Sequence, residues 1–398
     1  MTTRHQSLVL EQERAWRANL DPMRRYYARH QHLLLGQMGV VVTTKKAPPP
    51  VGAAAAPEQP ALNAPEMTTE ATEAERTRHM VCVFPPEALA DATAALGGMR
   101  DQDAKRLRPA LSRAARDDGW RSVPWAGSGA VEDPFAGMGP EVANFSEVNA
   151  HLSVQWTCAS HALDAGETRL DPILLIGPPG IGKTRFAHEI ARRMGTRMAV
   201  YSAGSAQAAF QLSGSDAGWS NAKPGIVFDL LAQGDSAVPV LVVDEVDKIG
   251  TWARENPLSA LLDLTEPETA RQYKDWCLQM MFDASKILVI CTANERASLA
   301  PPLLSRLTEF HIAPPTAAQR RLILEKYLGR LIETHECPAG MALNEASAAQ
   351  AADTADLDIR ELLRLLRAGF AAALVAESDR VILSLPRRGP GRLRIGFI

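Results

Sequence analysis

The feature that most constrains the fold is a glycine-rich octapeptide over residues 177–184, set between an apolar run and a helical pattern. Four apolar residues over 173–176 precede it, and residues 185–194 follow with a helical periodicity that stops at Gly195. The octapeptide matches G-x-x-x-x-G-K-[ST] at every fixed position, its members being Gly177, Pro178, Pro179, Gly180, Ile181, Gly182, Lys183 and Thr184. A strand, a glycine-rich turn and a helix N-terminus in this order predict a cradle for a phosphate group instead of an ordinary surface turn.

The same octapeptide predicts how the phosphate is held. The backbone N–H groups of the turn and the positive end of the helix dipole would face the anion. We expect Lys183 to reach the β- and γ-phosphates of a nucleotide and Thr184 to ligate Mg²⁺. A nucleotide with β- and γ-phosphates and Mg²⁺ are therefore the expected cofactors.

A second apolar run, over 240–243, ends in two carboxylates, Asp244 and Glu245. A buried strand ending there would deliver Asp244 to the magnesium shell, because this hard cation prefers oxygen ligands. Glu245 would then polarise the attacking water. This pattern is weak alone, but it lies about 60 residues after the octapeptide with a strand candidate between them. Together the two motifs predict a hydrolytic nucleotide site.

Three more polar residues extend this site. Asn294 follows the apolar run 287–291 and is predicted to orient the water, to cap the next turn, or to do both. Arg306 precedes the last strand candidate and suits an arginine finger, which stabilises charge on the transferred phosphoryl group; a surface ion pair is the alternative. Asp358 and Glu361 have capping-box spacing, which starts a helix with Arg360 in its first turn. Arg360 either points at the nucleotide or is a plain helix-surface arginine.

The order of patterns predicts an α/β fold. From about residue 142, helical patterns alternate with short apolar strands, which is typical of a parallel sheet covered on both faces. We expect a P-loop core over 142–314 with a five-stranded parallel sheet between helices, followed by a small helical lid over 315–385. The strand candidates are 173–176, 198–202, 240–243, 287–291 and 309–312, and the lid helices are predicted over 317–334 and 359–377.

The N-terminal third is predicted to be mostly helical and is harder to interpret. Residues 1–42 form a basic helical arm with interleaved aromatic residues, either a partner- or nucleic-acid-binding arm or an amphipathic helix packed on the body. Residues 43–78 have the composition of a disordered linker. Residues 79–124 form a small helical unit of unknown role, and 125–141 a second linker. The basic tail 386–398 either docks on a partner or is an ordinary disordered end.

Composition adds three expectations. The net charge of −3 and the pI of about 6.3 argue weakly against a dedicated nucleic-acid binder. The five cysteines lack C-x-x-C spacing and are predicted to be reduced thiols. The longest N-terminal apolar run, 33–42, is broken by glycines and is about half the length that a membrane span needs. We therefore expect a cytoplasmic protein with no membrane partner.

Taken in order, these motifs resemble the AAA+ ATPase module, and most closely that of the Lon-type proteases. The resemblance covers about residues 170–385 and includes the stretches 244–248, 256–264 and 302–306. It implies that the nucleotide is ATP, that Asn294 is sensor 1, that Arg360 is sensor 2, and that Arg306 acts on the ATP of a neighbouring subunit. It also implies a homo-oligomeric ring, usually a hexamer, because each site is completed by the next protomer.

The resemblance further places a pore loop at residues 218–225, where an aromatic residue grips a translocating polypeptide. Trp219 matches that aromatic, and a large ring with little rotamer entropy suits a sequence-independent grip. The apolar residue that usually follows is Ser220 here, and Trp219 packing against its own domain is the alternative. Trp252 is a weaker candidate for a second pore contact.

Lon proteases also carry a peptidase domain with a Ser–Lys dyad. The last lysine of this sequence is Lys326, inside the predicted lid, so we expect no protease activity in this chain. The expected function is Mg²⁺-dependent ATP hydrolysis by a ring that remodels or unfolds a protein client of unknown identity. A nucleic-acid-directed switch or loader is possible but not favoured, and a non-catalytic nucleotide-dependent scaffold is the third hypothesis.

Overall fold

The computed structural model describes residues 79–125, 132–162, 164–204, 209–219, 221–249, 257–335, 337 and 340–385. Several predicted features lie outside the described residues: the basic arm 1–42, the linker 43–78, Ser220, Trp252 and the tail 386–398. Among the described helices, none has the length and apolar character that a membrane crossing requires.

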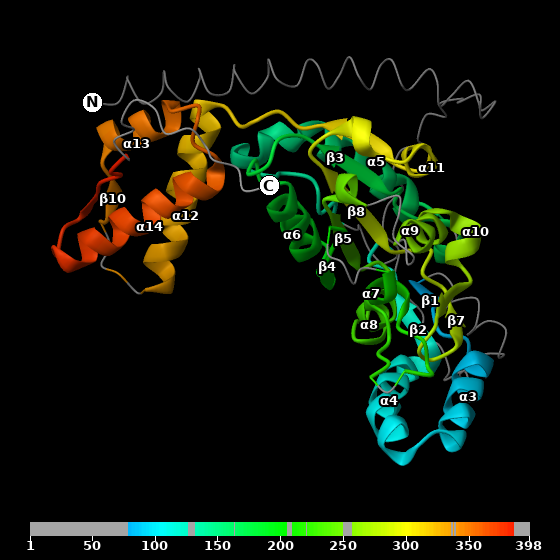
Figure 1. The fold of residues 1–398 in the computed structure, drawn as a ribbon. Helices are drawn as coiled ribbons and strands as arrows, with labels where there is room; N and C mark the ends of the chain where they lie inside the picture. The colour runs from blue at the N-terminus through cyan, green and yellow to red at the C-terminus, as the bar shows by residue number, and fades with distance from the viewer. Residues whose placement is uncertain are drawn as a thin grey trace, which may run out of the picture. The chain divides into compact units, whose positions relative to one another are not determined.

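A five-stranded parallel sheet forms the centre of the fold, with strand order β4-β5-β8-β3-β9. β3, β8 and the first four residues of β5 are buried without alternation, as expected for strands covered on both faces. This confirms the predicted fold class (Figure 1). The strands are β3 (Ile173–Ile176), β4 (Met198–Ser202), β5 (Val240–Asp244), β8 (Leu288–Ala293) and β9 (Thr308–His311).

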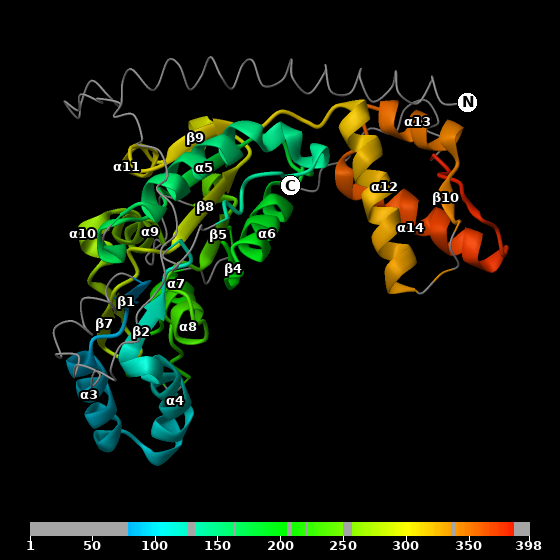
Figure 2. The ribbon, with the colours of Figure 1, turned by 180° about the vertical axis from the view of Figure 1, so that it is seen from behind.

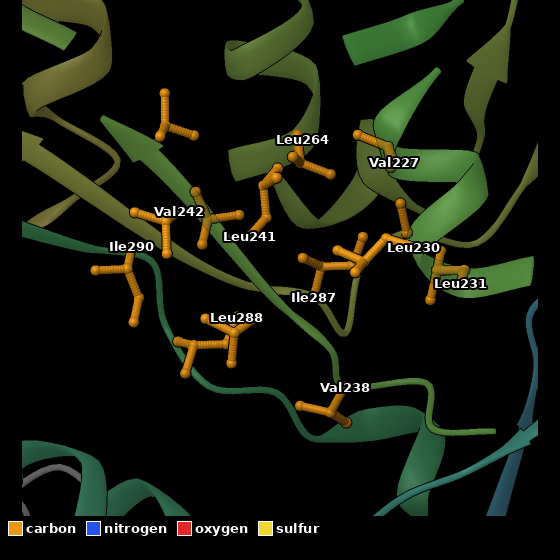
Figure 3. Close-up of a cluster of buried hydrophobic side chains, with 14 of the residues drawn as sticks. Val227, Leu230, Leu231, Val238, Leu241, Val242, Leu264, Ile287, Leu288 and Ile290 are labelled. Carbon is orange, nitrogen blue, oxygen red and sulfur yellow. The ribbon is translucent and has the colours of Figure 1, made fainter. Parts of the chain in front are cut away.

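Helices and short connecting elements surround this sheet, and α6 packs against β5 and β8. Figure 3 shows the apolar interior where side chains of β5, α8 and α9 meet those around β8. Every side chain labelled there is buried. The elements of this layer are η3 (Pro140–Phe145), α5 (Ser146–Ser160), α6 (Lys183–Arg193), α7 (Ala209–Ser213), α8 (Ile226–Ala232), α9 (Pro257–Thr265), α10 (Pro267–Ala270), β6 (Tyr273–Asp275), β7 (Met280–Phe282) and α11 (Pro301–Leu304).

The N-terminal unit consists of a two-stranded antiparallel sheet and two helices, and it shares its core with the elements around the five-stranded sheet. The Phe84 ring lies 5.3 Å from that of Phe228 on α8 and 5.5 Å from that of Phe282 on β7. The Val83 carbonyl accepts a hydrogen bond of 2.8 Å from the Asp283 N–H. The elements of this unit are β1 (Met80–Cys82), α3 (Pro86–Ala95), α4 (Asp101–Ala114) and β2 (Trp120–Ser122).

Arg121 joins the N-terminal unit to helix α8 from inside the core. Its side chain is fully buried, and its Nε donates to the Leu231 carbonyl at the end of α8, at 3.1 Å. Its other nitrogens donate to carbonyls at and beyond the end of α4, those of Arg113, Ala114, Arg116 and Trp120. A buried guanidinium is stable only with such partners, so the two helix ends are held to one group.

The described residues of the segment 125–141 are not a free linker as predicted, because two of its aromatic side chains are buried. Trp125 and Phe135 are buried, and their rings lie 5.6 and 5.8 Å from that of Trp156 on α5. Arg193 on α6 also donates to the carbonyls of Pro134 and Ala136. Its glycines and prolines suggested a free connection, but the large aromatic residues between them gain more by burial than by exposure.

The lid has its own hydrophobic core, built mainly from three helices (Figures 1 and 2). α12 (Ala317–Thr334) and α14 (Ile359–Val375) lie where helices were predicted, and α14 begins with the predicted capping box of Asp358 and Glu361. α13 (Glu345–Asp353) was not predicted. The predicted lid over 315–385 is not helical throughout, because β10 (Ala342–Leu343) and β11 (Arg380–Val381) form a short parallel pair within it.

Candidate active site

The glycine-rich turn connects β3 to α6, and its glycines are needed for its shape. Gly180 and Gly182 have φ values of +79° and +100°, a region that favours glycine. A Cβ atom on Gly177 would lie 2.5 Å from the backbone oxygen of Ile312, so the turn is also packed too closely for a side chain. The turn ends at Lys183, the first residue of α6.

Lys183 lies at the centre of the site and is only 8% exposed. Its Nζ donates to the carbonyls of Gly177 at 2.6 Å and Pro178 at 3.1 Å, and it lies 3.4 Å from Asn294 Oδ1. Burial lowers the pKa of Lys183, and the nearby carboxylate of Asp244 opposes that shift. Because these three contacts are to neutral oxygens, the lysine remains available to an anion in the turn.

Asp244 ends β5, and its side chain is fixed by a threonine from the neighbouring strand. The Thr292 hydroxyl donates to Asp244 Oδ1 and accepts from the Glu245 N–H at 3.2 Å. Thr292 was not among the predicted site residues, and its only signal in the sequence is its place two residues before Asn294 on β8. With one carboxylate oxygen held by this hydroxyl, Asp244 presents the kind of oxygen ligand that Mg²⁺ takes. Thr184 supplies a hydroxyl at the start of α6.

Asn294 follows β8 and links the motifs. Its amide oxygen faces Lys183, while its backbone N–H donates to Asp247 Oδ2 at 3.2 Å. Asp247 belongs to the second motif but had no predicted role, and its Oδ1 is buried with no hydrogen-bond partner among the described residues. The structure thus brings Lys183, Asp244 and Asn294 together at the carboxyl ends of three adjacent strands.

Glu245 occupies an unusual backbone conformation directly after β5. Its φ of 58° and ψ of 47° are left-handed, which is rare for glutamate and typical of functional turns. Its carboxylate forms an ion pair of 2.7 Å with Lys248, and both side chains are open to solvent. The carboxylate is therefore held by one exposed lysine and can exchange partners at low cost.

A cavity of about 570 Å³ adjoins the glycine-rich turn, a volume typical of small-molecule sites. One wall is the turn itself and the other is formed by residues that follow β8 and β9. Its lining residues are Ile176, Gly177, Pro178, Pro179, Asn294, Glu295, His311, Ile312 and Ala313.

The start of lid helix α14 contacts the glycine-rich turn. The Ile359 N–H donates to the Gly180 carbonyl at 3.2 Å, and a Cβ on Gly180 would lie 2.8 Å from Asp358. Arg360 follows directly and is exposed. The pKa of Lys183 is lowered mainly by burial of the lysine, and the positive charge of Arg360 lowers it further. The structure therefore places Arg360 within electrostatic reach of the turn.

Arg306 lies apart from this cluster. Its Nε forms an ion pair of 3.2 Å with Glu266 at the start of α10, and its Nη1 donates to the Pro302 carbonyl at 2.9 Å. It is not among the residues that line the cavity beside the glycine-rich turn.

The described part of the predicted pore loop is an ordered turn with its aromatic residue exposed. The Trp219 N–H donates to the Asp216 carbonyl at 3.1 Å, and Asp216 Oδ1 accepts from the Gly218 N–H at 2.8 Å. Trp219 is 53% exposed, and its only ring contact among the described residues is with Phe210, at 5.2 Å. It is therefore not buried in its own domain.

Comparison with known proteins agrees with this geometry. Residues 173–314 match the family described as "ATPase family associated with various cellular activities (AAA)". The chain therefore carries an AAA ATPase domain, built on the sheet and site described above.

Over this region the chain is similar to Lon protease homologues. It is 32% identical over 199 residues to the mitochondrial Lon protease homolog of Homo sapiens, covering 50% of this chain and 20% of that protein. It is 38% identical over 158 residues to Lon protease 1 of Sorangium cellulosum (strain So ce56), covering 39% and 20%. The chain thus spans about a fifth of the length of these relatives. Among solved structures, the RuvB Holliday junction branch migration motor of Thermotoga maritima matches with 19% identity and a TM-score of 0.38, covering 61% of this chain and 66% of that one.

Proposed function

We propose that this chain hydrolyses ATP with Mg²⁺ as part of a Lon-like AAA+ ring, and that hydrolysis drives the remodelling or unfolding of a protein client. The observation that carries the proposal is the convergence of Lys183, Asn294 and Asp244 at one edge of the sheet. In this proposal the core extends over 142–314 and the lid over 315–385.

Each residue of the cluster has a distinct task in the proposed reaction. Backbone N–H groups of 177–184 and the Lys183 ammonium hold the phosphates. Thr184 and Asp244 are the residues that would hold Mg²⁺, which when bound would supply positive charge to the phosphate oxygens. Glu245 accepts a proton from the attacking water after leaving Lys248, and Asn294 orients that water. Arg360 at the start of α14 senses the nucleotide and couples it to the lid.

The position of Arg306 supports a site shared between subunits. Because Arg306 pairs with Glu266 away from its own cavity, we propose that it completes the ATP site of the next protomer. Each protomer would then give a finger to one neighbour and receive one from the other. A heterologous contact of this kind generates a ring where the rotation between protomers closes, and we propose that it closes as a hexamer.

The exposed Trp219 loop supports a polypeptide client. An ordered turn presenting a half-exposed indole offers a large apolar contact without demanding a particular client sequence. We further propose that this chain does not cleave its client.

The proposal is tested first by ATP turnover. Glu245→Gln should keep ATP affinity, measured by calorimetry, and lower turnover by at least about 100-fold, because a general base contributes that much. Lys183→Ala should lose ATP binding itself. Glu147→Gln on the exposed start of α5 is the matched control and should change neither quantity. A Glu245→Gln protein that still turns over ATP would contradict the assigned roles, and a wild-type protein without turnover would support the scaffold hypothesis.

The client is tested separately. Trp219→Ala should abolish unfolding of a tagged fluorescent protein while ATP turnover continues. Unchanged unfolding would remove the threading mechanism, and release of peptide fragments from casein would show that the chain is a protease. Steep salt-dependent binding of duplex DNA would favour the nucleic-acid-directed alternative.

A further inference from the structure

Exposed aromatic and apolar side chains gather on two segments that lie side by side. Among the described residues, Trp219, Trp276 and Met281 are each about half exposed. The first belongs to the Trp219 loop, residues 214–225, and the other two belong to the β6–β7 hairpin, residues 273–282. Such side chains indicate an interaction site where they gather in one patch, whereas single ones are normal on a protein surface.

One buried carboxylate connects the two segments. Asp275 accepts the Gly225 N–H at 2.7 Å, at the end of the Trp219 loop. Its other oxygen accepts the N–H groups of Cys277 and Leu278 at 2.9 Å, which shapes the hairpin turn. Burial raises the pKa of Asp275 to about 6 against the effect of these donors. The carboxylate of Asp275 thus accepts hydrogen bonds from backbone N–H groups of both segments and holds them together.

A second link joins the other end of the loop to the hairpin. The backbone N–H of Trp276 donates to the Ser213 carbonyl at 2.8 Å. Ser213 directly precedes the Trp219 loop. Both ends of the loop are therefore fixed to the strand and turn that carry Trp276. The two indoles belong to one braced structure.

A cavity of about 550 Å³ lies beside the hairpin, and its chemistry is specific. Trp276 supplies exposed aromatic surface, the Tyr273 ring is buried, and Asp263 and Glu268 supply two exposed carboxylates. One cation, Lys274, lies 4.2 Å from the centre of the Trp276 ring. The remaining lining residues are Ser213, Ser259, Ala260, Thr269 and Gln272. Two carboxylates against one ammonium leave the cavity negative beside an aromatic ring.

We propose that Trp276 and this cavity form a second polypeptide-binding site, which takes a basic side chain of the client next to the segment gripped by Trp219. The inference rests on the proposed function, because it adds a site to the same client path. An arginine or lysine of an extended chain would face the carboxylates of Asp263 and Glu268 and the aromatic surface beside them. The Trp219 loop would supply the sequence-independent part of the grip and the cavity the preference for charge.

Charge decides between a polypeptide and other occupants. A nucleic acid would bring phosphates toward Asp263 and Glu268, where repulsion opposes binding. A second copy of this chain would have to bury Trp276 in the ring, and a substitution there would then change the mass of the assembly. A polypeptide client with basic side chains brings no phosphates to the carboxylates, and its binding does not require Trp276 to hold the ring together.

The test measures binding of fluorescein-labelled casein by anisotropy, with Glu245→Gln protein in ATP. Trp276→Ala should raise the Kd about tenfold or more, as expected for a central aromatic contact. Val375→Ala, which shortens an apolar side chain at the exposed end of lid helix α14, is the control and should leave the Kd unchanged. Introduced into the wild-type protein, Trp276→Ala should leave ATP turnover and the mass of the ring by light scattering unchanged.

Charge preference is tested with a short labelled peptide containing arginines and its twin containing glutamates. The parent protein should bind the arginine peptide more tightly, and Asp263→Asn with Glu268→Gln should abolish that difference. These two substitutions are on the surface, so they test the site without touching Trp276.

The outcomes separate this inference from the proposed function. If Trp219→Ala weakens casein binding but Trp276→Ala does not, the second site is refuted and the client path stands. If the parent protein binds neither casein nor the peptides, both are refuted. A changed ring mass in Trp276→Ala, or duplex DNA binding that this variant loses, would assign the surface to another partner and overturn the inference.

Discussion

Arg306→Ala separates a structural role of this arginine from a catalytic one, because the two differ in magnitude. The ion pair with Glu266 has side chains 31% and 43% exposed, so its loss should cost about 0–1 kcal/mol of unfolding free energy. That cost corresponds to a fall in Tm of a few degrees at most. An arginine that stabilises the transferred phosphoryl group contributes about 1000-fold in turnover, or about 4 kcal/mol.

The assay is steady-state ATP turnover at saturating ATP together with a thermal melt. Glu266→Ala is the matched control, because it breaks the same ion pair and leaves the arginine in place. We expect Arg306→Ala to melt within a few degrees of the wild type and to lose about 1000-fold in kcat. Glu266→Ala should melt similarly and keep most of its turnover.

Mixing then tests whether Arg306 acts on the neighbouring subunit. A ring assembled from equal parts Arg306→Ala and Glu245→Gln protein contains interfaces where an intact Glu245 meets an intact Arg306. Random mixing makes about a quarter of interfaces of this kind, and turnover should recover toward that fraction. A mixture no more active than its two components would refute action in trans. Full turnover by Arg306→Ala alone would refute the finger.

Three further perturbations follow from the geometry of the core and the site. Gly177→Ala places a Cβ 2.5 Å from the Ile312 oxygen, so the affinity for ATP, measured by calorimetry, should fall about tenfold or more. Gly329→Ala is the control: its Cβ would meet open space, and this variant should bind ATP like the wild type. Phe84→Ala removes a fully buried ring and should cost about 3–5 kcal/mol in urea unfolding; a loss below about 1 kcal/mol would show that the N-terminal unit does not share the core. The pKa of Glu189 is lowered from 4.5 to about 2 by hydrogen bonds from arginines three and four residues further along. Its stabilisation is therefore present above pH 4.5 and lost toward pH 2, so Glu189→Gln should destabilise by about 1 kcal/mol at pH 7 after solvent screening and match the wild type near pH 2.

The strands that carry the site could be predicted from the sequence because their signal is local. β3 and β4 begin and end at the predicted residues. α12 also has its predicted bounds, since Thr316 starts it with a capping box. Continuous apolar runs and caps are properties of neighbouring residues, and they survive in the fold.

The partners of the site residues could not be predicted in the same way. Two of these contacts exist only because β5 lies beside β8. They are the hydrogen bond from Thr292 to Asp244 and the one from the Asn294 N–H to Asp247. Sheet order is set by long-range packing, which hydrophobic periodicity does not specify. The two-residue strands β10 and β11 are too short to show a period, and the alanine-rich α13 has only a weak apolar stripe.

The role of the N-terminal unit follows from its place in the core. Arg121 holds the carbonyl of Leu231 at the end of α8, and Phe84 packs on Phe228 within the same helix. α8 starts directly after Gly225, the last residue of the Trp219 loop. The N-terminal unit therefore contacts helix α8 both near its C-terminal end and along one side. A loop that pushes on a polypeptide needs a support that does not yield, and buried contacts of this kind resist displacement better than surface contacts. We infer that residues 79–125 support the Trp219 loop through α8, because they share one hydrophobic core with that helix.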